Sequence, residues 1–211
     1  MDKPAAILSG QITGLLLAGG RGSRMGDVDK GLQLFRGEPL AFHVMQNLAP
    51  QVGAFVISAN RNGAAYQAIS DGLGHGEAVL CADQLAGFEG PLAGLQTGLR
   101  QCATEFLLSA PCDSPFLPSD LVQRLAQALL EQQADIAVAM TGDGKEAQVH
   151  RVISLMRSSV LPSLDVFLAQ GGRKVGAWHA SLTTIQVAFK NETAFYNINT
   201  LEELRQLESD A

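Results

Sequence analysis

Apolar residues follow two periodicities along this chain, and the two alternate. Short, almost continuously apolar runs predict buried strands at residues 12–17, 54–58, 78–81, 106–110, 135–140, 149–156 and 183–189. Between them, apolar residues recur every three or four positions and predict helices at 39–48, 91–102, 118–132, 160–169, 173–180 and 201–207. Thr200 and Glu203 have the spacing of a capping box at the start of the last helix. The alternation predicts a three-layer α/β fold, with a mostly parallel central sheet and helices on both faces.

The first strand leads directly into a segment rich in glycine and in positive charge. Its glycines and cations are Gly19, Gly20, Arg21, Gly22, Arg24, Gly26 and Lys30. Glycines let backbone N–H groups approach anionic oxygens closely, and the cations add full charge beside them, so the segment predicts a phosphate-binding loop. It is not a Walker loop, because Asp27 follows Gly26, and Met25 stands where a dinucleotide fingerprint needs its third glycine. A glycine-rich turn without ligand is the alternative.

Polar residues at the ends of other strands predict where the chemistry lies. Ligands of open parallel sheets bind beyond the carboxyl ends of the strands, where this segment, the turn near Asp83 and the loop at 111–114 can converge. Asp113 follows a buried strand, where an unpaired carboxylate is costly and a divalent cation is a natural partner. The alternative is an aspartate that caps a turn before Pro115.

Composition restricts the class of protein. The 211 residues suit a single domain, 1–211, and the net charge of −6 argues against general nucleic-acid binding. Cys81, Cys102 and Cys112 are odd in number and lack metal-pair spacing, which favours reduced thiols and a cytoplasmic location. Residues 1–10 predict neither a signal peptide nor a membrane span.

Four segments, in order, carry a resemblance to a known family. They are residues 17–30, 90–94 (Gly-Pro-Leu-Ala-Gly), 111–115 (Pro-Cys-Asp-Ser-Pro) and 197–203 (Asn-Ile-Asn-Thr-Leu-Glu-Glu). The chain resembles nucleotidyltransferases that activate a phosphorylated acceptor, and most closely the molybdenum cofactor guanylyltransferases. The resemblance implies a Rossmann-like nucleotidyltransferase fold and a Mg²⁺-dependent reaction of GTP with molybdopterin cofactor that gives the guanine dinucleotide and pyrophosphate. It also implies transient contacts with cofactor-synthesis proteins and apo-molybdoenzymes.

The resemblance assigns roles to particular residues. Arg24 and Lys30 would steady the triphosphate, and Asp113 would bind magnesium. The implied nucleotide-binding residues are Leu17, Ala18, Gly19, Gly20, Lys30, Asp83 and Asp113. The candidate acceptor-binding residues are Gly90, Pro91, Arg173, Lys174, Asn197 and Asn199. Arg173 and Lys174 are candidates because of their charge, and the alternative is that they open a solvated helix. For Asn199 the alternatives are a second metal ligand and a cap of the backbone before the last helix. The nucleotide part would span about 10–135 and the acceptor part about 136–200.

The chain departs from the family pattern at two places. Ser58 stands where relatives usually have asparagine, and His150-Arg151-Val152 replaces a His-Pro-Thr sequence. Three other functions stay open: a cytidylyltransferase of the same cofactor, a nucleotidyltransferase for a sugar or polyol phosphate, and a nucleotide-binding partner without catalysis.

Overall fold

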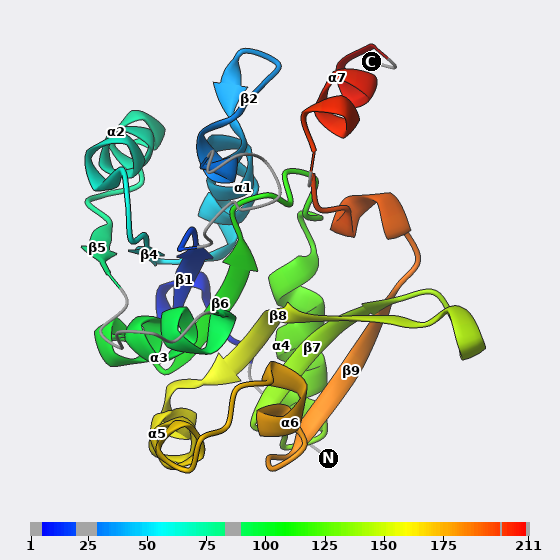
Figure 1. Cartoon of the computed structure of the whole chain (residues 1–211). Coiled ribbons are helices and arrows are strands. Elements are labelled where there is room, and N and C mark those ends of the chain that lie inside the picture. Colours follow the sequence, from blue (N-terminus) through cyan, green and yellow to red (C-terminus); the bar gives the residue numbers. More distant parts are fainter. Residues whose placement is uncertain (1–5, 20–28, 83–89, 199, 210–211) are drawn as a thin grey trace.

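The computed structural model describes residues 6–19, 29–82, 90–198 and 200–209. Within them, seven strands form one sheet in the order β5–β4–β1–β6–β8–β7–β9 (Figure 1). The strands are β1 (Ile12–Leu17), β4 (Ala54–Ser58), β5 (Val79–Cys81), β6 (Phe106–Pro111), β7 (Ile136–Thr141), β8 (Gln148–Arg157) and β9 (Thr184–Phe189). The expected mostly parallel sheet is confirmed. β8 alone among these strands runs against its neighbours.

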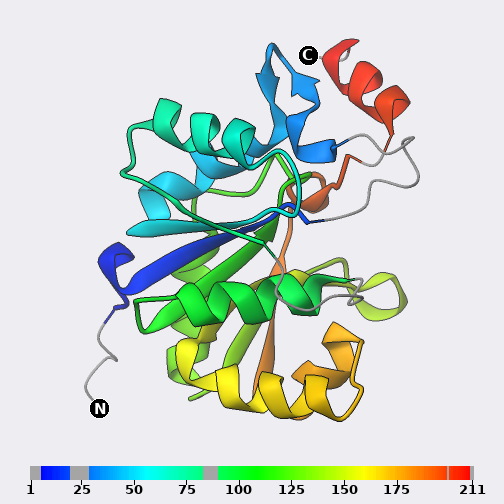
Figure 2. The same cartoon turned by 60° about the vertical axis from the view of Figure 1, so that its left-hand side comes forward.

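Helices cover both faces of the sheet (Figure 2). One face carries α1 (Leu40–Leu48), α2 (Gly63–Leu73) and α4 (Leu121–Glu131). The other carries α3 (Pro91–Gln101), α5 (Leu161–Ala169) and α6 (Val175–His179). The expected three-layer arrangement is therefore confirmed. No helix in the described ranges is long and apolar enough to cross a membrane.

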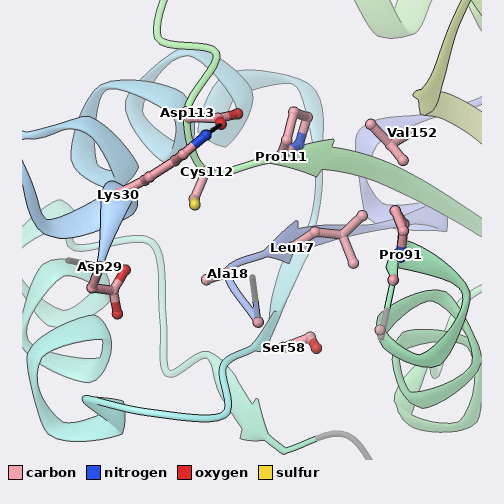
Figure 3. Close-up of a pocket in the computed structure, with 13 residues that line it drawn as sticks. Leu17, Ala18, Asp29, Lys30, Ser58, Pro91, Pro111, Cys112, Asp113 and Val152 are labelled. Atoms are coloured by element: carbon pink, nitrogen blue, oxygen red, sulfur yellow. Dashed lines mark hydrogen bonds and ion pairs between the residues drawn. The ribbon is translucent and has the colours of Figure 1, made fainter. Parts of the chain in front are cut away.

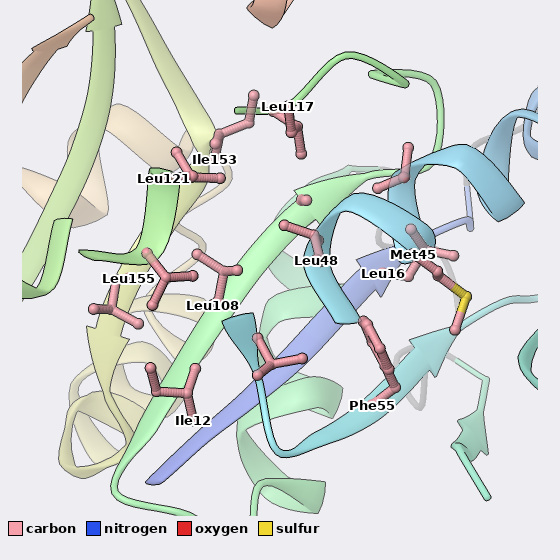
Figure 4. Packing of buried hydrophobic residues seen from close by; sticks show 14 of the residues in the cluster. Ile12, Leu16, Met45, Leu48, Phe55, Leu108, Leu117, Leu121, Ile153 and Leu155 are labelled. Carbon is pink, nitrogen blue, oxygen red and sulfur yellow. The ribbon is translucent and has the colours of Figure 1, made fainter. Parts of the chain in front are cut away.

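Neighbouring residues of the central strands divide between the two cores. Leu15 and Leu107 face the cluster under α3, α5 and α6, whereas Leu16 and Leu108 face the cluster under α1 and α4 (Figure 4). This alternation explains why the strands read as continuous apolar runs, because both faces of each strand are buried. Each fully buried leucine side chain contributes about 1.5–3 kcal/mol relative to an exposed one.

A small third cluster joins the chain's C-terminal helix to the start of α1. The strands β2 (Leu34–Phe35) and β3 (Glu38–Pro39) form a hairpin beside α7 (Leu201–Ser209). Phe35, Leu40, Ile198 and Leu204 pack together there. The expected capping box is confirmed, because the Thr200 N–H donates to Glu203 at 3.3 Å and the Glu203 N–H donates to the Thr200 hydroxyl at 3.1 Å.

The differences from the expected elements are local. α2 was not predicted from the sequence, because its buried residues, Tyr66, Ile69 and Ser70, are too few to form a long apolar stripe. The β2–β3 hairpin was not predicted either, and its turn places Arg36 at φ 52° and Gly37 at φ 83°. Arginine at a left-handed turn position is a weak signal compared with the usual asparagine. The fourth helix begins at Leu121 rather than at 118, after a turn.

Candidate active site

A cavity of about 350 Å³ opens where the strand order reverses. From β1 the chain adds β4 and β5 on one side and then crosses to place β6 on the other. Open α/β sheets bind their ligands at such a switch point, beyond the carboxyl ends of the strands. Leu17 and Pro111, the last residues of β1 and β6, are register partners here. The cavity is lined by Leu17, Ala18, Gly19, Asp29, Lys30, Ser58, Gly90, Pro91, Gly94, Pro111, Cys112, Asp113 and Val152 (Figure 3).

The sheet itself makes room for the cavity. β6 pairs with β8 only as far as Ser109 and Ser154, so the last residues of β6 have no partner in β8. The β7–β8 register shifts between Val138 and Ala139, which leaves residues 151–153 of β8 bulged out of the ladder. The Ser109 hydroxyl donates to the Val152 carbonyl at 2.8 Å. The bulge thus holds Val152 at the cavity wall.

Lys30 and Asp113 meet across this cavity from segments 83 positions apart in the sequence. The Lys30 Nζ donates to the Asp113 Oδ2 at 3.4 Å, and the two side chains are 22% and 12% exposed. Among the described residues the buried Asp113 Oδ1 has no hydrogen-bond partner. Burial raises the pKa of Asp113 above its ordinary value, and the charge of Lys30 opposes that effect. One carboxylate oxygen of Asp113 thus accepts from Lys30, and the other has no partner among the described residues.

The donor set limits which cation fits. In the described part of the chain no group of three or more His, Cys, Asp or Glu residues could hold a metal ion. A single carboxylate suits Mg²⁺, which keeps several waters and takes its other ligands from substrate phosphates. Cys112 is no competing ligand, because burial, followed by the charge of Asp113, raises the pKa of its thiol and keeps it neutral.

The backbone at the end of β1 is already partly engaged. The Ala18 N–H donates to the Ser58 carbonyl at 2.8 Å, and the Leu17 carbonyl accepts from the Cys112 N–H at 3.1 Å. The Gly19 carbonyl accepts from the Asn60 side chain at 3.3 Å. Ala18 therefore has no amide to offer a phosphate, and Leu17 and Ala18 present apolar surface to the cavity instead.

The structure brings most of the expected nucleotide-site residues together. Leu17, Ala18, Gly19, Lys30 and Asp113 line one cavity with the candidate acceptor residues Gly90 and Pro91. Gly20, Arg24, Asp83 and Asn199 lie outside the described residues. The sequence analysis did not select Asp29, Ser58 or Val152, which also line the cavity.

The remaining candidate acceptor residues lie outside the cavity wall. Asn197 is close to it, because its Oδ1 accepts from the Ser114 hydroxyl at 2.6 Å and the Ile198 N–H donates to the Asp113 carbonyl at 2.9 Å. Arg173 precedes α6, and its guanidinium donates to the carbonyls of Leu168 and Gly172. Neither Arg173 nor its neighbour Lys174 lines the cavity.

Comparison with known proteins agrees with this geometry. The family model described as the MobA-like NTP transferase domain matches residues 14–183, which include most of β1 and all the residues that line the cavity, Asp113 among them. The chain belongs to this family. The family resemblance seen in the four motifs is thereby confirmed.

Relatives cover nearly the whole chain. A molybdenum cofactor guanylyltransferase of Ralstonia pickettii is 50% identical over 206 residues, covering 95% of this chain and 98% of its own. Another of Cupriavidus necator is 51% identical over 200 residues, covering 94% and 96%. The crystal structure of molybdopterin-guanine dinucleotide biosynthesis protein A from Archaeoglobus fulgidus superposes with a TM-score of 0.71 at 22% identity, covering 94% of this chain and 97% of that one. This last likeness supports the fold.

Proposed function

We propose that this protein transfers GMP from GTP to the terminal phosphate of the molybdenum-molybdopterin cofactor, giving molybdopterin guanine dinucleotide and pyrophosphate. The relatives at about 50% identity bear the name of that activity. The observation that carries the proposal is the Lys30–Asp113 pair, a lysine and a half-satisfied carboxylate in one cavity at the switch point of the sheet. These are the groups that a triphosphate and a magnesium ion need.

The reaction needs little activation of the nucleophile. An oxygen of the acceptor phosphate is already ionised, so it attacks the α-phosphorus of GTP without help from a serine, cysteine or histidine. The bond from the α-phosphorus to the bridging oxygen breaks, and pyrophosphate leaves with the electron pair. Positioning and neutralisation of charge then supply most of the rate enhancement.

The residues of the cavity divide this work. Lys30 neutralises charge on the triphosphate and on the departing pyrophosphate, as Arg24 would from the glycine-rich segment. Asp113 would hold Mg²⁺, which would supply Lewis-acid neutralisation of phosphate charge. Leu17, Ala18 and Gly19 would form an apolar wall for the nucleoside, and Gly20 and Asp83 are further candidates for contact with the nucleotide.

The acceptor would bind next to the nucleotide. Gly90 and Pro91 line the cavity, with Pro91 beside Leu17 (Figure 3), and Asn197 lies one hydrogen bond from Ser114, which follows Asp113. Asn199, Arg173 and Lys174 are further candidates for contact with the acceptor. The nucleotide part would then correspond to about 10–135 and the acceptor part to about 136–200.

The test is the mass of the product. Incubation with GTP, Mg²⁺ and a source of molybdopterin cofactor should give the guanine dinucleotide and one pyrophosphate per product. CTP, or a sugar phosphate as acceptor, should give none. A dinucleotide formed from CTP would instead indicate a cytidylyltransferase, and magnesium-dependent GTP binding without product would indicate a binding partner.

A matched pair of variants tests the site within that assay. Lys30→Met should lower kcat/KM for GTP by about 10²–10³-fold, the range for loss of one preorganised charge-stabilising group. Lys190→Met is the control, because Lys190 is an exposed lysine outside the cavity lining. Equal activity of the two variants would contradict the proposed site.

A further inference from the structure

The connection between β4 and α2, together with the first turn of α2, contacts both ends of the glycine-rich segment. The Asn60 Nδ2 donates to the carbonyl of Gly19 at 3.3 Å, where the segment begins. Near its other end, the Asn62 Nδ2 donates to Asp29 Oδ2 at 3.0 Å and the Tyr66 hydroxyl donates to Asp29 Oδ1 at 2.5 Å. One short stretch of chain therefore fixes the points where the segment leaves β1 and where it reaches Lys30.

Asp29 lines the cavity, but both of its carboxylate oxygens are occupied by hydrogen bonds to other side chains of the protein. Each of its oxygens accepts a hydrogen bond from a side chain of the β4–α2 region. Tyr66 is fully buried, and burial raises the pKa of its hydroxyl, which favours the protonated form that donates to Asp29. Asp29 thus has the contacts of an anchor, in contrast to Asp113 with its unsatisfied oxygen.

The backbone around Lys30 fits closely against the same tyrosine. Lys30 begins a 3-10 helix, Lys30–Leu32. A Cβ on Gly31 would collide with the Tyr66 hydroxyl and would come within 3.0 Å of the Cys112 Cβ. Only a glycine lets the 3-10 helix lie this close to Tyr66. The chain is therefore held by hydrogen bonds at Asp29 before Lys30 and by close packing at Gly31 after it.

We propose that Tyr66 and Asn62, acting through Asp29, are positioning residues that hold Lys30 opposite Asp113. Lys30 follows Asp29 directly, so its Cα lies about 3.8 Å from the Cα of a residue whose carboxylate accepts two hydrogen bonds. Holding a lysine in one position costs conformational entropy of both its side chain and its backbone. Because the backbone at Asp29 is already anchored, only the entropy of the side chain remains to be lost. This inference rests on the proposed nucleotidyl transfer only because the test below measures kcat/KM for GTP.

The test is a double-mutant cycle between Tyr66 and Lys30. Tyr66→Phe removes one oxygen and leaves the buried ring in place. We expect kcat/KM for GTP to fall about 10–100-fold, the range for misplacing a catalytic group by about 1 Å. In a Lys30→Met background the same change should have less than a twofold effect, because there is no lysine left to position. Tyr196→Phe is the matched control, since Tyr196 is 55% exposed and outside the cavity lining.

Two further measurements separate positioning from general destabilisation. Asn62→Gly removes the second donor and keeps the left-handed backbone that Asn62 adopts at φ 55°. Like Tyr66→Phe, it should lower kcat/KM for GTP when Lys30 is present. In the Lys30→Met background it should have little effect. Urea unfolding of each variant should show a fully folded protein at the assay temperature.

The outcomes distinguish this inference from the proposed function. Suppose that wild type turns over GTP. The positioning role is then wrong if Tyr66→Phe lowers activity by the same factor in the Lys30→Met background as in wild type. It is also wrong if Tyr66→Phe has no effect in wild type. If wild type does not use GTP, the proposed function fails, and the cycle is measured instead on calorimetric binding of magnesium pyrophosphate. Weaker pyrophosphate binding that depends on Lys30 would still support positioning, and independence of Lys30 would overturn it.

Discussion

Two glycines of α3 should separate stability from activity when each is replaced by alanine. Gly94 and Gly98 lie one turn apart on the same helix, and both face β1. A Cβ on Gly98 would come within 2.7 Å of Leu15 Cδ1 and 3.0 Å of Leu15 Cγ. A Cβ on Gly94 would come within 2.6 Å of Leu17 Cδ2 and 3.1 Å of the Ser58 Oγ. The chemistry of the two changes is identical, and only the surroundings differ.

The surroundings give opposite expectations. Leu15 is fully buried and cannot move aside, so overpacking at Gly98 costs about 1–3 kcal/mol, against about 1 kcal/mol gained in helix propensity. Gly98→Ala should therefore lose up to about 2 kcal/mol of unfolding free energy, at about 2–4 °C of Tm per kcal/mol, with kcat/KM nearly unchanged. Leu17 borders the cavity, so at Gly94 its methyl group can turn into that space.

Gly94→Ala should then keep its stability within about 1 kcal/mol of wild type, because the gain in helix propensity offsets the displacement of Leu17. The displaced methyl group narrows the cavity beside the proposed nucleoside, and kcat/KM for GTP should fall about 10–100-fold. Urea unfolding and pyrophosphate release measure the two quantities on the same samples. Wild-type kcat/KM in Gly94→Ala, or loss of activity without loss of stability in Gly98→Ala, would refute the reasoning.

Three further predictions concern the site, the core and a helix end. Asp113→Asn should lower pyrophosphate release at least about 10²-fold. Burial raises the folded-state pKa of Asp113, so the folded state holds a proton more tightly than the unfolded state does. As pH rises from about 3.8 through the raised pKa, wild type should therefore lose stability relative to Asp113→Asn, and at higher pH the difference should be constant. Urea midpoints of the two proteins measure this difference. A difference that does not change with pH would contradict the expectation. Leu108→Ala removes a fully buried side chain between β6 and α4 and should cost about 2–5 kcal/mol in urea unfolding. Thr200→Ala removes the cap of α7 and should cost about 0.5–2 kcal/mol, with activity retained; an unchanged urea midpoint would count against the cap.

The convergence of Lys30 and Asp113 could be foreseen because it follows from topology. The carboxyl ends of parallel strands share one edge of the sheet, so residues that follow β1 and β6 meet there whatever the length of chain between them. Gly90 and Pro91 were expected at the site from the family resemblance instead, and they line the same cavity.

The direction and bulge of β8 could not be foreseen from the sequence. A strand buried on both faces reads as the same apolar run in either direction, and the register shift at Val138 and Ala139 depends on its partner strand. Arg173 and Lys174 show a related limit. Their charge could be read from the sequence, but their distance from the cavity depends on where α6 packs.

The anchoring of Asp29 was missed for a third reason. Its partner Tyr66 lies on α2, a helix whose short buried stripe gave no periodic signal. A hydrogen bond between side chains 37 positions apart becomes visible only once the fold brings them together. Positioning residues are therefore harder to read from sequence than charged residues at strand ends.

The most direct test of the central claim is a crystal structure with Mn²⁺ and a GTP analogue whose α–β bridge is a methylene group. The analogue cannot release pyrophosphate, and Mn²⁺ gives an anomalous signal at the site of the metal. The account predicts the anomalous peak beside the Asp113 carboxylate and the Lys30 Nζ within hydrogen-bond distance of a phosphate oxygen. A nucleotide bound outside the cavity at the ends of β1 and β6, or a metal peak away from Asp113, would contradict it.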